Sequence, residues 1–191
     1  MPELFDAFPH LETHGVIIRK MDEGDLDRLR ALSWSDAVYR YCPHFLWHKK
    51  DGDLRAAVRN LGARDFDNKR TIIAGVYLPE QPDVLIGLAE IFDYDAALRM
   101  VTIGYKLDEA YWGRGIATRV IAALRDYLLG EIRLNRVQAF VMPANIASGK
   151  ALMKNGFVRE GLIRRGYQWN GQGAVDLEIY AMLSSDFGGI A

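Results

Sequence analysis

A glycine-rich stretch, YWGRGIAT at residues 111–118, contains the residues best suited to hold a reactive ligand. Gly113 and Gly115 flank Arg114, and an apolar segment follows them. If a helix begins here, its first backbone N–H groups have no partners within the helix and suit a phosphate. Glycines let such an anion approach the backbone closely. A tight turn before a helix explains the same residues equally well, so the motif alone leaves both interpretations open.

Two familiar phosphate motifs are excluded by the residues that follow the glycines. A P-loop requires Lys and then Ser or Thr after its last glycine, whereas Ile116 and Ala117 stand there. The dinucleotide-binding fingerprint requires a third glycine or alanine at a different spacing, within an early βαβ unit. The stretch therefore fits neither class of nucleotide-binding protein.

Cys42, His44 and His48 form a second group of residues with chemical potential. No carboxylate accompanies the two histidines and Pro43 interrupts the segment, so a surface or core role is favoured and no metal site is expected. Because Cys42 is the single cysteine, an internal disulfide is excluded and a structural thiol is favoured over a catalytic one.

Length and composition indicate one globular domain. The chain has 191 residues, 50% of them hydrophobic, and a formal net charge of -1. Residues 1–191 are therefore expected to form a single domain, with no overall charge that favours nucleic acid or an anionic membrane. No apolar stretch has the length of a signal peptide core or a membrane helix, so a cytoplasmic location is expected.

Hydrophobic periodicity and turn residues predict the elements that must position these groups. Strands are predicted at 16–21, 70–78, 84–92, 100–107, 136–141, 157–167 and 174–183, and helices at about 26–31, 52–61, 114–128 and 145–155. Short polar connections make 70–107 an antiparallel meander, and the alternation within 100–107 indicates a strand with one buried face. The mixture is an α+β sheet domain with helices on its faces.

In this order of elements, Trp112 to Ala117 resembles motif A of the GNAT superfamily of acyl-CoA-dependent N-acyltransferases, Gln/Arg-x-x-Gly-x-Gly/Ala, with Trp112 replacing the usual Gln or Arg. The resemblance extends over about 16–183. The further stretches Ile86-Gly87, Ile103-Gly104-Tyr105, Asn145-x-x-Ser148, Asn155-Gly156-Phe157 and Glu160-Gly161 are similar to the RimJ/RimL branch, which acetylates the N-termini of ribosomal proteins.

The resemblance implies the GNAT fold, a mostly antiparallel twisted sheet of about seven strands flanked by helices. Its fourth and fifth strands, here 100–107 and 136–141, would splay apart to admit the pantetheine of acetyl-CoA, while the motif A amides hold the pyrophosphate. By position, the acetyl-CoA site would contain Ile103, Gly104, Tyr105, Leu107, Trp112, Gly113, Arg114, Gly115, Ala117, Thr118, Asn145, Ser148 and Lys154, with Lys150 a weaker candidate. A backbone N–H within 103–105 would polarise the thioester carbonyl.

Ser148 is the candidate acid. Many relatives carry a tyrosine seven residues after the motif asparagine, but Leu152 occupies that position. The RimJ/RimL branch has a serine three residues after the asparagine instead, and we hypothesise that Ser148 protonates or hydrogen-bonds the CoA thiolate. Capping of the helix is the alternative role.

Glu90 is the candidate base, acting on the amine directly or through water. A solvent-facing strand position is the alternative. Relatives often have a glutamate where Thr102 stands, which weakens any assignment. Glu109 flanks the cofactor loop and Glu160 is expected to pair with a nearby arginine, so both are poorer candidates.

These residues predict an acetyl-CoA-dependent N-acetyltransferase using direct amine attack in a ternary complex. The acceptor is a protein N-terminus or a small amine such as an aminoglycoside or polyamine; an α-amine titrates at roughly 7.7–8.0 and needs less basic help than a lysine at about 10.4. By family position, the resemblance implies that aromatic residues of 34–47 and 167–169 flank the acceptor groove, with core packing the alternative for most of these rings. The terminal hairpin offers an edge for a homodimer. A non-catalytic acyl-CoA-binding sensor is the alternative function.

Overall fold

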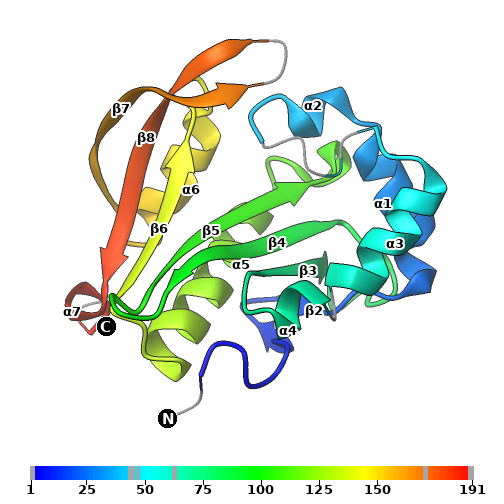
Figure 1. Cartoon of the computed structure of the whole chain (residues 1–191), viewed down its shortest axis with the longest axis horizontal. Coiled ribbons are helices and arrows are strands. Elements are labelled where there is room, and N and C mark those ends of the chain that lie inside the picture. Colours follow the sequence, from blue (N-terminus) through cyan, green and yellow to red (C-terminus); the bar gives the residue numbers. More distant parts are fainter. Residues whose placement is uncertain (1–2, 43–45, 47, 62–63, 170–171, 189–191) are drawn as a thin grey trace.

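The computed structural model describes residues 3–42, 46, 48–61, 64–169 and 172–188, and eight strands form one sheet in the order β1-β2-β3-β4-β5-β6-β8-β7 (Figure 1). The strands are β1 (Leu11–Thr13), β2 (Val16–Arg19), β3 (Thr71–Tyr77), β4 (Gly87–Asp95), β5 (Met100–Leu107), β6 (Arg136–Val141), β7 (Val158–Trp169) and β8 (Gly173–Leu183). The helices are α1 (Leu26–Ser33), α2 (Asp36–Tyr39), α3 (Asp51–Leu61), α4 (Arg64–Asp67), α5 (Ile116–Arg125), α6 (Ile146–Lys154) and α7 (Ser184–Phe187). Short helical turns are η1 (Glu23–Asp25), η2 (Glu109–Tyr111) and the π-helical η3 (Asp126–Glu131).

The predicted meander is confirmed. β3 pairs with β4 and β4 with β5, both antiparallel, so each strand returns beside the previous one. Two details differ from the expectation: β4 begins and ends three residues later than predicted, and β1 adds an eighth strand that pairs with β2. β1 is only three residues long, too short to give a periodic signal in the sequence.

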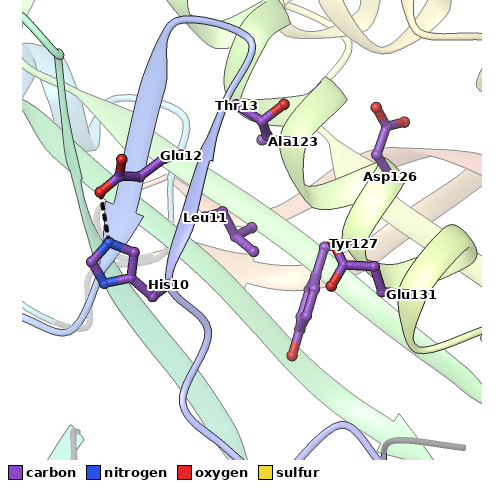
Figure 2. Close-up of a pocket in the computed structure, with 8 residues that line it drawn as sticks. All are labelled: His10, Leu11, Glu12, Thr13, Ala123, Asp126, Tyr127 and Glu131. Atoms are coloured by element: carbon purple, nitrogen blue, oxygen red, sulfur yellow. Dashed lines mark hydrogen bonds and ion pairs between the residues drawn. The ribbon is translucent and has the colours of Figure 1, made fainter.

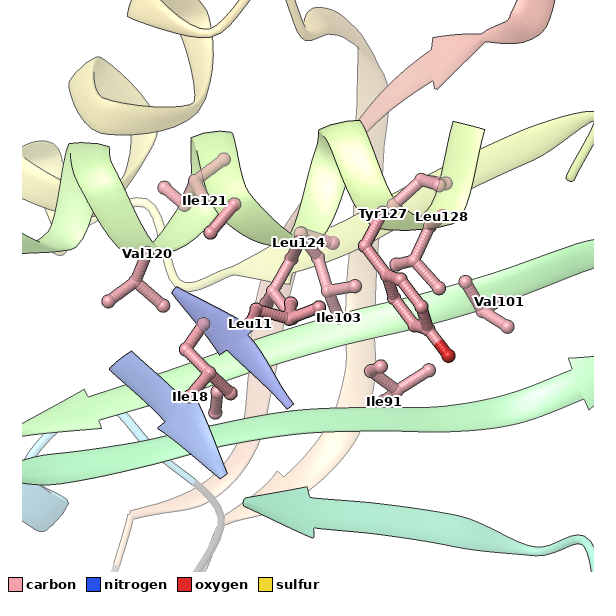
Figure 3. Packing of buried hydrophobic residues seen from close by; sticks show 14 of the residues in the cluster. Leu11, Ile18, Ile91, Val101, Ile103, Val120, Ile121, Leu124, Tyr127 and Leu128 are labelled. Carbon is pink, nitrogen blue, oxygen red and sulfur yellow. The ribbon is translucent and has the colours of Figure 1, made fainter. Parts of the chain in front are cut away.

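One face of the sheet is covered by α5 and α6. The apolar stripe of α5 packs on the central strands, where Val120, Ile121 and Leu124 lie over side chains of β2, β4 and β5 (Figure 3). These three helix residues are at most 1% exposed. Since helical spacing turns one side of α5 toward the sheet, the helix holds its own N-terminus at the end of β5.

The other face is covered by α1, α2 and α3 (Figure 1). These helices bury a second cluster that includes Leu29, Leu54 and Leu88. This layer corrects the expectation that β5 has a single buried face. Thr102 is fully buried and Lys106 is only 4% exposed. Apolar and polar residues alternate along β5 although both of its faces are buried. The polar side chains on the second face have hydrogen-bond partners within the buried layer.

β5 and β6 part along most of their length, as the resemblance implies. They are parallel neighbours, but their register contains only Met100↔Arg136, Val101↔Val137 and Thr102↔Gln138. Beyond Thr102 the strands diverge, which opens the sheet beside the C-terminal half of β5. The mixed, mostly antiparallel sheet with helices on both faces is the fold expected from the sequence.

Helix α6 ends where the sequence places its stop. Gly156 has a φ of +85°, a left-handed conformation that glycine adopts without strain. Asn155 is buried, and its Nδ2 donates to the carbonyls of Thr118 (3.0 Å) and Ala151 (2.9 Å), which ties α6 to the first turn of α5.

In the described part of the chain, no helix combines the length and apolar character needed to cross a membrane.

Candidate functional site

A groove of about 1130 Å³ opens where β5 and β6 diverge. The predicted site residues that line it are Glu90, Ile103, Gly104, Tyr105, Leu107, Trp112, Gly113, Gly115, Ala117, Thr118, Asn145, Ser148 and Lys154. Arg114 does not line it, and its guanidinium lies 5.4 Å from the centre of the Tyr111 ring. The topology therefore brings nearly all of the predicted residues to one cavity, from four separate segments of the chain.

The glycine motif forms an open cradle at the start of α5. Gly113 and Gly115 have φ values of +72° and +73°, and a Cβ atom at either position would have no atom within 4 Å. Gly115 is the N-cap of α5 and provides no side chain to satisfy the free N–H groups of the first turn. Uncapped donors beside empty space fit the pyrophosphate of acetyl-CoA, since they offer hydrogen bonds and the positive end of a helix dipole.

Trp112 braces this cradle against the end of β5. Its Nε1 donates to the carbonyl of Leu107 at 2.8 Å, while the side chain stays 49% exposed. An indole carries one donor and no acceptor, and the single donor of Trp112 is used by the bond to Leu107. The side chain therefore fixes the loop to the end of β5. The departure from the polar family residue thus has a structural reason in this chain.

Two further contacts fix the connection between β5 and α5. Arg28 of α1 donates to Asp108 at 2.7 Å, and Asp108 also accepts from the backbone of Ala110 at 2.9 Å. Ser35, the N-cap of α2, donates to Glu109 at 2.8 Å. These bonds join the cradle to the helices on the opposite face, and they give Glu109 a structural partner.

A pair of hydroxyl groups lies on the α5–α6 face of the groove. Tyr105 of β5 donates to Ser148 Oγ at 3.0 Å, and the Ser148 backbone N–H donates to Asn145 Oδ1 at 3.3 Å. Burial raises the pKa of Tyr105 to about 12, so its phenol remains protonated near neutral pH. Leu152, at the position of the missing tyrosine, is 1% exposed and belongs to the core. The phenol in this groove therefore comes from Tyr105 of β5, whereas the tyrosine of many relatives would come from position 152 of α6.

An ion pair lies on the α1–α3 face of the same strand. Lys106 Nζ donates to Glu90 Oε1, and both side chains are at most 10% exposed. Burial by itself would lower the pKa of Lys106, but the neighbouring Glu90 carboxylate raises it on balance. Glu90 is therefore a buried partner of a lysine, rather than the solvent-facing residue that was its alternative role.

Neither Tyr105 as a hydroxyl donor nor Lys106 as a partner of Glu90 was recognised in the sequence. Tyr105 was predicted as a residue of the acetyl-CoA site with a candidate backbone N–H, without a role for its hydroxyl, and Lys106 resembled a residue of an exposed face. The usable signal was present for Lys106: Glu90 lies on the preceding strand of the meander, and antiparallel register brings the two residues together.

The remaining candidates have other environments. Glu160 forms two bonds with Arg136 of β6, at 2.9 and 2.6 Å, rather than with an arginine next to it in sequence. Burial raises the pKa of the Cys42 thiol to about 11, which disfavours a nucleophilic thiolate. His48 contacts Asp36 at 3.1 Å and stacks on Trp34 with ring centres 4.6 Å apart.

His44 lies outside the described residues, as does Trp47. Within the described residues, His, Cys, Asp and Glu form no group of three that could hold a metal ion. Of the expected aromatic walls, Tyr41, Tyr167 and Trp169 line the groove, and the last two have ring centres 5.5 Å apart.

A smaller cavity of about 200 Å³ lies between β1 and the turns that follow α5 (Figure 2). His10, Glu12, Asp126 and Glu131 are among its lining residues, and His10 bonds to Glu12 at 2.9 Å. None of the predicted site residues reaches this cavity. The chemistry implied by the sequence is therefore concentrated in the large groove.

Comparisons with known proteins agree with this geometry. A family model described as "Acetyltransferase (GNAT) domain" matches residues 16–158. The probable N-acetyltransferase YjcK of Bacillus subtilis is 39% identical over 105 residues, which are 54% of this chain and 58% of that relative. The uncharacterized N-acetyltransferase YoaA of the same organism is 28% identical over 176 residues, which cover 92% of this chain and 97% of YoaA.

Among solved structures, that of RimL, a ribosomal-protein acetyltransferase in complex with coenzyme A, has a TM-score of 0.77 at 19% identity and covers 92% of this chain and 97% of RimL. A ribosomal-protein-serine acetyltransferase of Escherichia coli and a spermidine N-acetyltransferase of Vibrio cholerae also match. Because the family model spans more than half of the chain, the protein belongs to the GNAT family of N-acetyltransferases, which use acetyl-CoA, and it resembles the RimJ/RimL branch of that family.

Proposed function

We propose that the protein transfers an acetyl group from acetyl-CoA to the α-amine of a peptide or protein N-terminus, by direct attack in a ternary complex. The observation that carries this proposal is the arrangement of two polar pairs on opposite faces of β5. Glu90 and Lys106 face the groove from one side, and Tyr105 and Ser148 face it from the other. A reaction that removes a proton from an amine and gives one to a thiolate needs polar groups on both sides.

Glu90 is the base in this proposal. Its Oε1 accepts from Lys106, and its Oε2 lies 3.0 Å from the position that a Cβ of Gly104 would take. Gly104 pairs with Glu90 in the register of β4 and β5, so the carboxylate sits directly over the middle of β5. An amine docked above Gly104 would meet Oε2 and pass its proton to it, directly or through water.

Tyr105 and Ser148 supply the proton for the thiolate. Ser148 receives a hydrogen bond from Tyr105, so its own hydroxyl hydrogen is free to point into the groove. When Ser148 gives that proton to the departing sulfur, Tyr105 can replace it along the existing bond. Two hydroxyls in series thereby take the place of the single tyrosine that many relatives carry.

The backbone of Tyr105 is the proposed oxyanion donor. Asp108 N–H bonds to Ile86 on the β4 side of the sheet, so with a period of two the amides of residues 103, 105 and 107 point away from β4. The carbonyls of Tyr105 and Leu107 also point away from β4, because they accept hydrogen bonds from Cys42 and Trp112. Tyr105 lies beyond the last pair with β6 at Thr102, which leaves its N–H facing the groove where negative charge develops on the acetyl oxygen.

The charge of the groove favours an α-amine over a polyamine. Its lining contains three acidic side chains, Asp65, Glu90 and Asp93, and three basic ones, Arg70, Lys106 and Lys154. A polycation would be bound best by a groove with a net negative charge. The aromatic wall of Tyr41, Tyr167 and Trp169 instead suits the body of a peptide.

The proposal treats residues 1–191 as one catalytic domain, and a homodimer through the edge strand β7 stays a prediction. Two measurements test the function. Calorimetry with acetyl-CoA must show binding, and release of free CoA thiol must depend on an added amine. Thiol release with N-terminal peptides above that with spermidine or an aminoglycoside supports the proposal. Tight acetyl-CoA binding without thiol release for any amine would support the non-catalytic sensor instead.

A further inference from the structure

The acceptor side of the groove already contains an amine that belongs to the protein. Lys106 extends from β5 and its side chain is 3% exposed, yet the residue lines the groove together with Glu90 and Gly104. Most lysines keep the ammonium group in water, because its burial without a partner is costly. A lysine held at this point therefore needs an explanation that the proposed reaction does not provide.

Register places this amine above the reactive part of β5. Lys106 and Gly104 are two residues apart on one strand, so their side-chain directions share a face. Glu90 lies opposite Gly104, and its Oε1 holds Lys106 Nζ. The Lys106 side chain thus reaches back toward Gly104, the position above which the acceptor amine docks in the proposed mechanism. Lys106 and a docked acceptor would thus share the Glu90 carboxylate, with Lys106 on Oε1 and the acceptor on Oε2.

Groups from three elements and one loop face Lys106, and Glu90 of β4 provides the negative charge. The Tyr39 ring of α2 lies 5.8 Å from Nζ, Cys42 follows α2, and Tyr167 comes from β7. Burial raises the pKa values of Tyr39 and Cys42, so both stay neutral near neutral pH. Burial alone would lower the pKa of Lys106, and Glu90 reverses this effect. Without Glu90, the amine would lose its proton more readily.

We propose that Lys106 is an internal acceptor that Glu90 holds in the unreactive ammonium form, so that Glu90 protects the enzyme from acetylating its own groove. This inference rests on the proposed function, because acetyl-CoA must bind beside β5. If Glu90 is neutralised, the free electron pair of Nζ attacks the acetyl carbon, the N–C bond forms and the C–S bond breaks. The proton lost from Nζ passes to the thiolate, which leaves as CoA thiol, and Lys106 becomes N-acetylated.

The test replaces the carboxylate by its neutral isostere, Glu90→Gln, in the full-length protein. Wild-type and variant protein are incubated with acetyl-CoA without any acceptor, and the Lys106 peptide is quantified by mass spectrometry. We expect acetylation of Lys106 in the variant at least about tenfold above wild type, because each unit of lowered pKa raises the neutral fraction of a mostly protonated amine about tenfold. Modification should also increase with pH in the variant until Lys106 is fully neutral.

Two controls make the result specific. Glu160→Gln removes a carboxylate that bonds to Arg136 and does not line the groove, and it should leave Lys106 unmodified. Glu90→Gln combined with Lys106→Arg should show no acetylation in the peptide that contains residue 106. Acetylation that appears equally at exposed lysines that do not line the groove, such as Lys20 and Lys69, would be non-enzymatic and would overturn the proposal.

The outcomes separate this inference from the proposed function. Absence of acetyl-CoA binding in calorimetry would contradict the proposed function itself. A folded Glu90→Gln variant that binds acetyl-CoA but leaves Lys106 at the wild-type level would overturn only the inference. If that variant does not fold, Glu90→Met decides: it removes the charge and keeps the length of the side chain. Acetylation of Lys106 above wild type is then expected, whereas the wild-type level would overturn the inference.

Discussion

Tyr105 and Lys106 are neighbours on β5, and their side chains lie on opposite faces of the sheet. Tyr105 bonds to Ser148 beneath α6, and Lys106 bonds to Glu90 beneath α1–α3. A strand directs successive side chains to opposite faces, so these adjacent residues reach the two groups proposed for the proton transfers, Ser148 on one face and Glu90 on the other. At the scale of residues, the proposed site consists of two hydrogen-bonded pairs on opposite faces of one strand.

Removal of the Tyr105 hydroxyl tests the proposed proton transfer to the CoA thiolate. We expect Tyr105→Phe and Ser148→Ala each to lower kcat by about 10²-fold, the lower end of general acid–base effects, with little change in the Kd of acetyl-CoA. The proton relay would be broken in both variants, so the double variant should be scarcely slower than either single one. Tyr127→Phe is the matched control, because Tyr127 lines the small cavity instead of the groove. An unchanged kcat in Tyr105→Phe would contradict the relay.

Sequence reasoning singled out Ser148 and Glu90 as candidates but did not predict their hydrogen-bond partners. Spacing after the motif asparagine pointed to Ser148, and an acid on a meander strand pointed to Glu90. Their partners depend on which strand or helix lies opposite, which is a property of register and packing. Lys106 in particular resembled a solvated residue, because a buried lysine is exceptional and only its ion pair makes it tolerable.

At the scale of elements, the cradle depends on the junction of β5 and α5. β5 ends at Leu107, α5 begins at Ile116, and the two are joined by η2 and the glycine motif. The motif, the strand and the helix were all predictable from the sequence, since glycine content and both periodicities are local. The extra strand β1 and the cover over the second face of β5 were not, because three residues give no period and a buried polar face resembles an exposed one.

Substitution at the cradle tests this junction. Gly115→Ala should weaken acetyl-CoA binding at least about tenfold, because its methyl group would enter the open space of the cradle. It should also destabilise the fold by about 1–2 kcal/mol, the cost of a left-handed conformation for a residue with a Cβ. Calorimetry and urea unfolding measure the two effects.

Gly52→Ala is the control for Gly115→Ala. Gly52 lies in α3, a Cβ there would have no atom within 4 Å, and its φ is not in the left-handed region. Alanine should leave acetyl-CoA affinity unchanged and should not lower stability. Equal effects of the two substitutions on acetyl-CoA binding would contradict the role of the cradle.

At the scale of the whole molecule, the fold keeps several phenols out of water. Burial raises the pKa values of Tyr105 and Tyr127 to about 12, and it also raises those of Tyr39 and Tyr77. The neutral phenol is thus favoured more strongly in the folded state than in the unfolded chain, where it titrates near 10. This stabilisation is complete below about pH 10 and is lost as the pH rises toward about 12.

We therefore expect the free energy of unfolding to decline steeply above about pH 10. Tyr127 is 8% exposed, and its contribution to this loss of unfolding free energy is on the order of 2 kcal/mol once its phenol is fully ionised. Urea unfolding of the wild type and of Tyr127→Phe between about pH 8 and 11 measures the effect. The variant should lose less stability than the wild type over this interval, and identical pH dependence would show that Tyr127 does not contribute.

The central claim is that the groove beside β5 acetylates α-amines. The most direct measurement uses a peptide with a free N-terminus and one internal lysine, incubated with the protein and acetyl-CoA and then fragmented in a mass spectrometer. We predict one acetyl group, located on the N-terminal nitrogen, released together with an equal amount of free CoA thiol. Acetylation of the lysine side chain alone, or no acetylation of a peptide while spermidine is acetylated, would contradict the account.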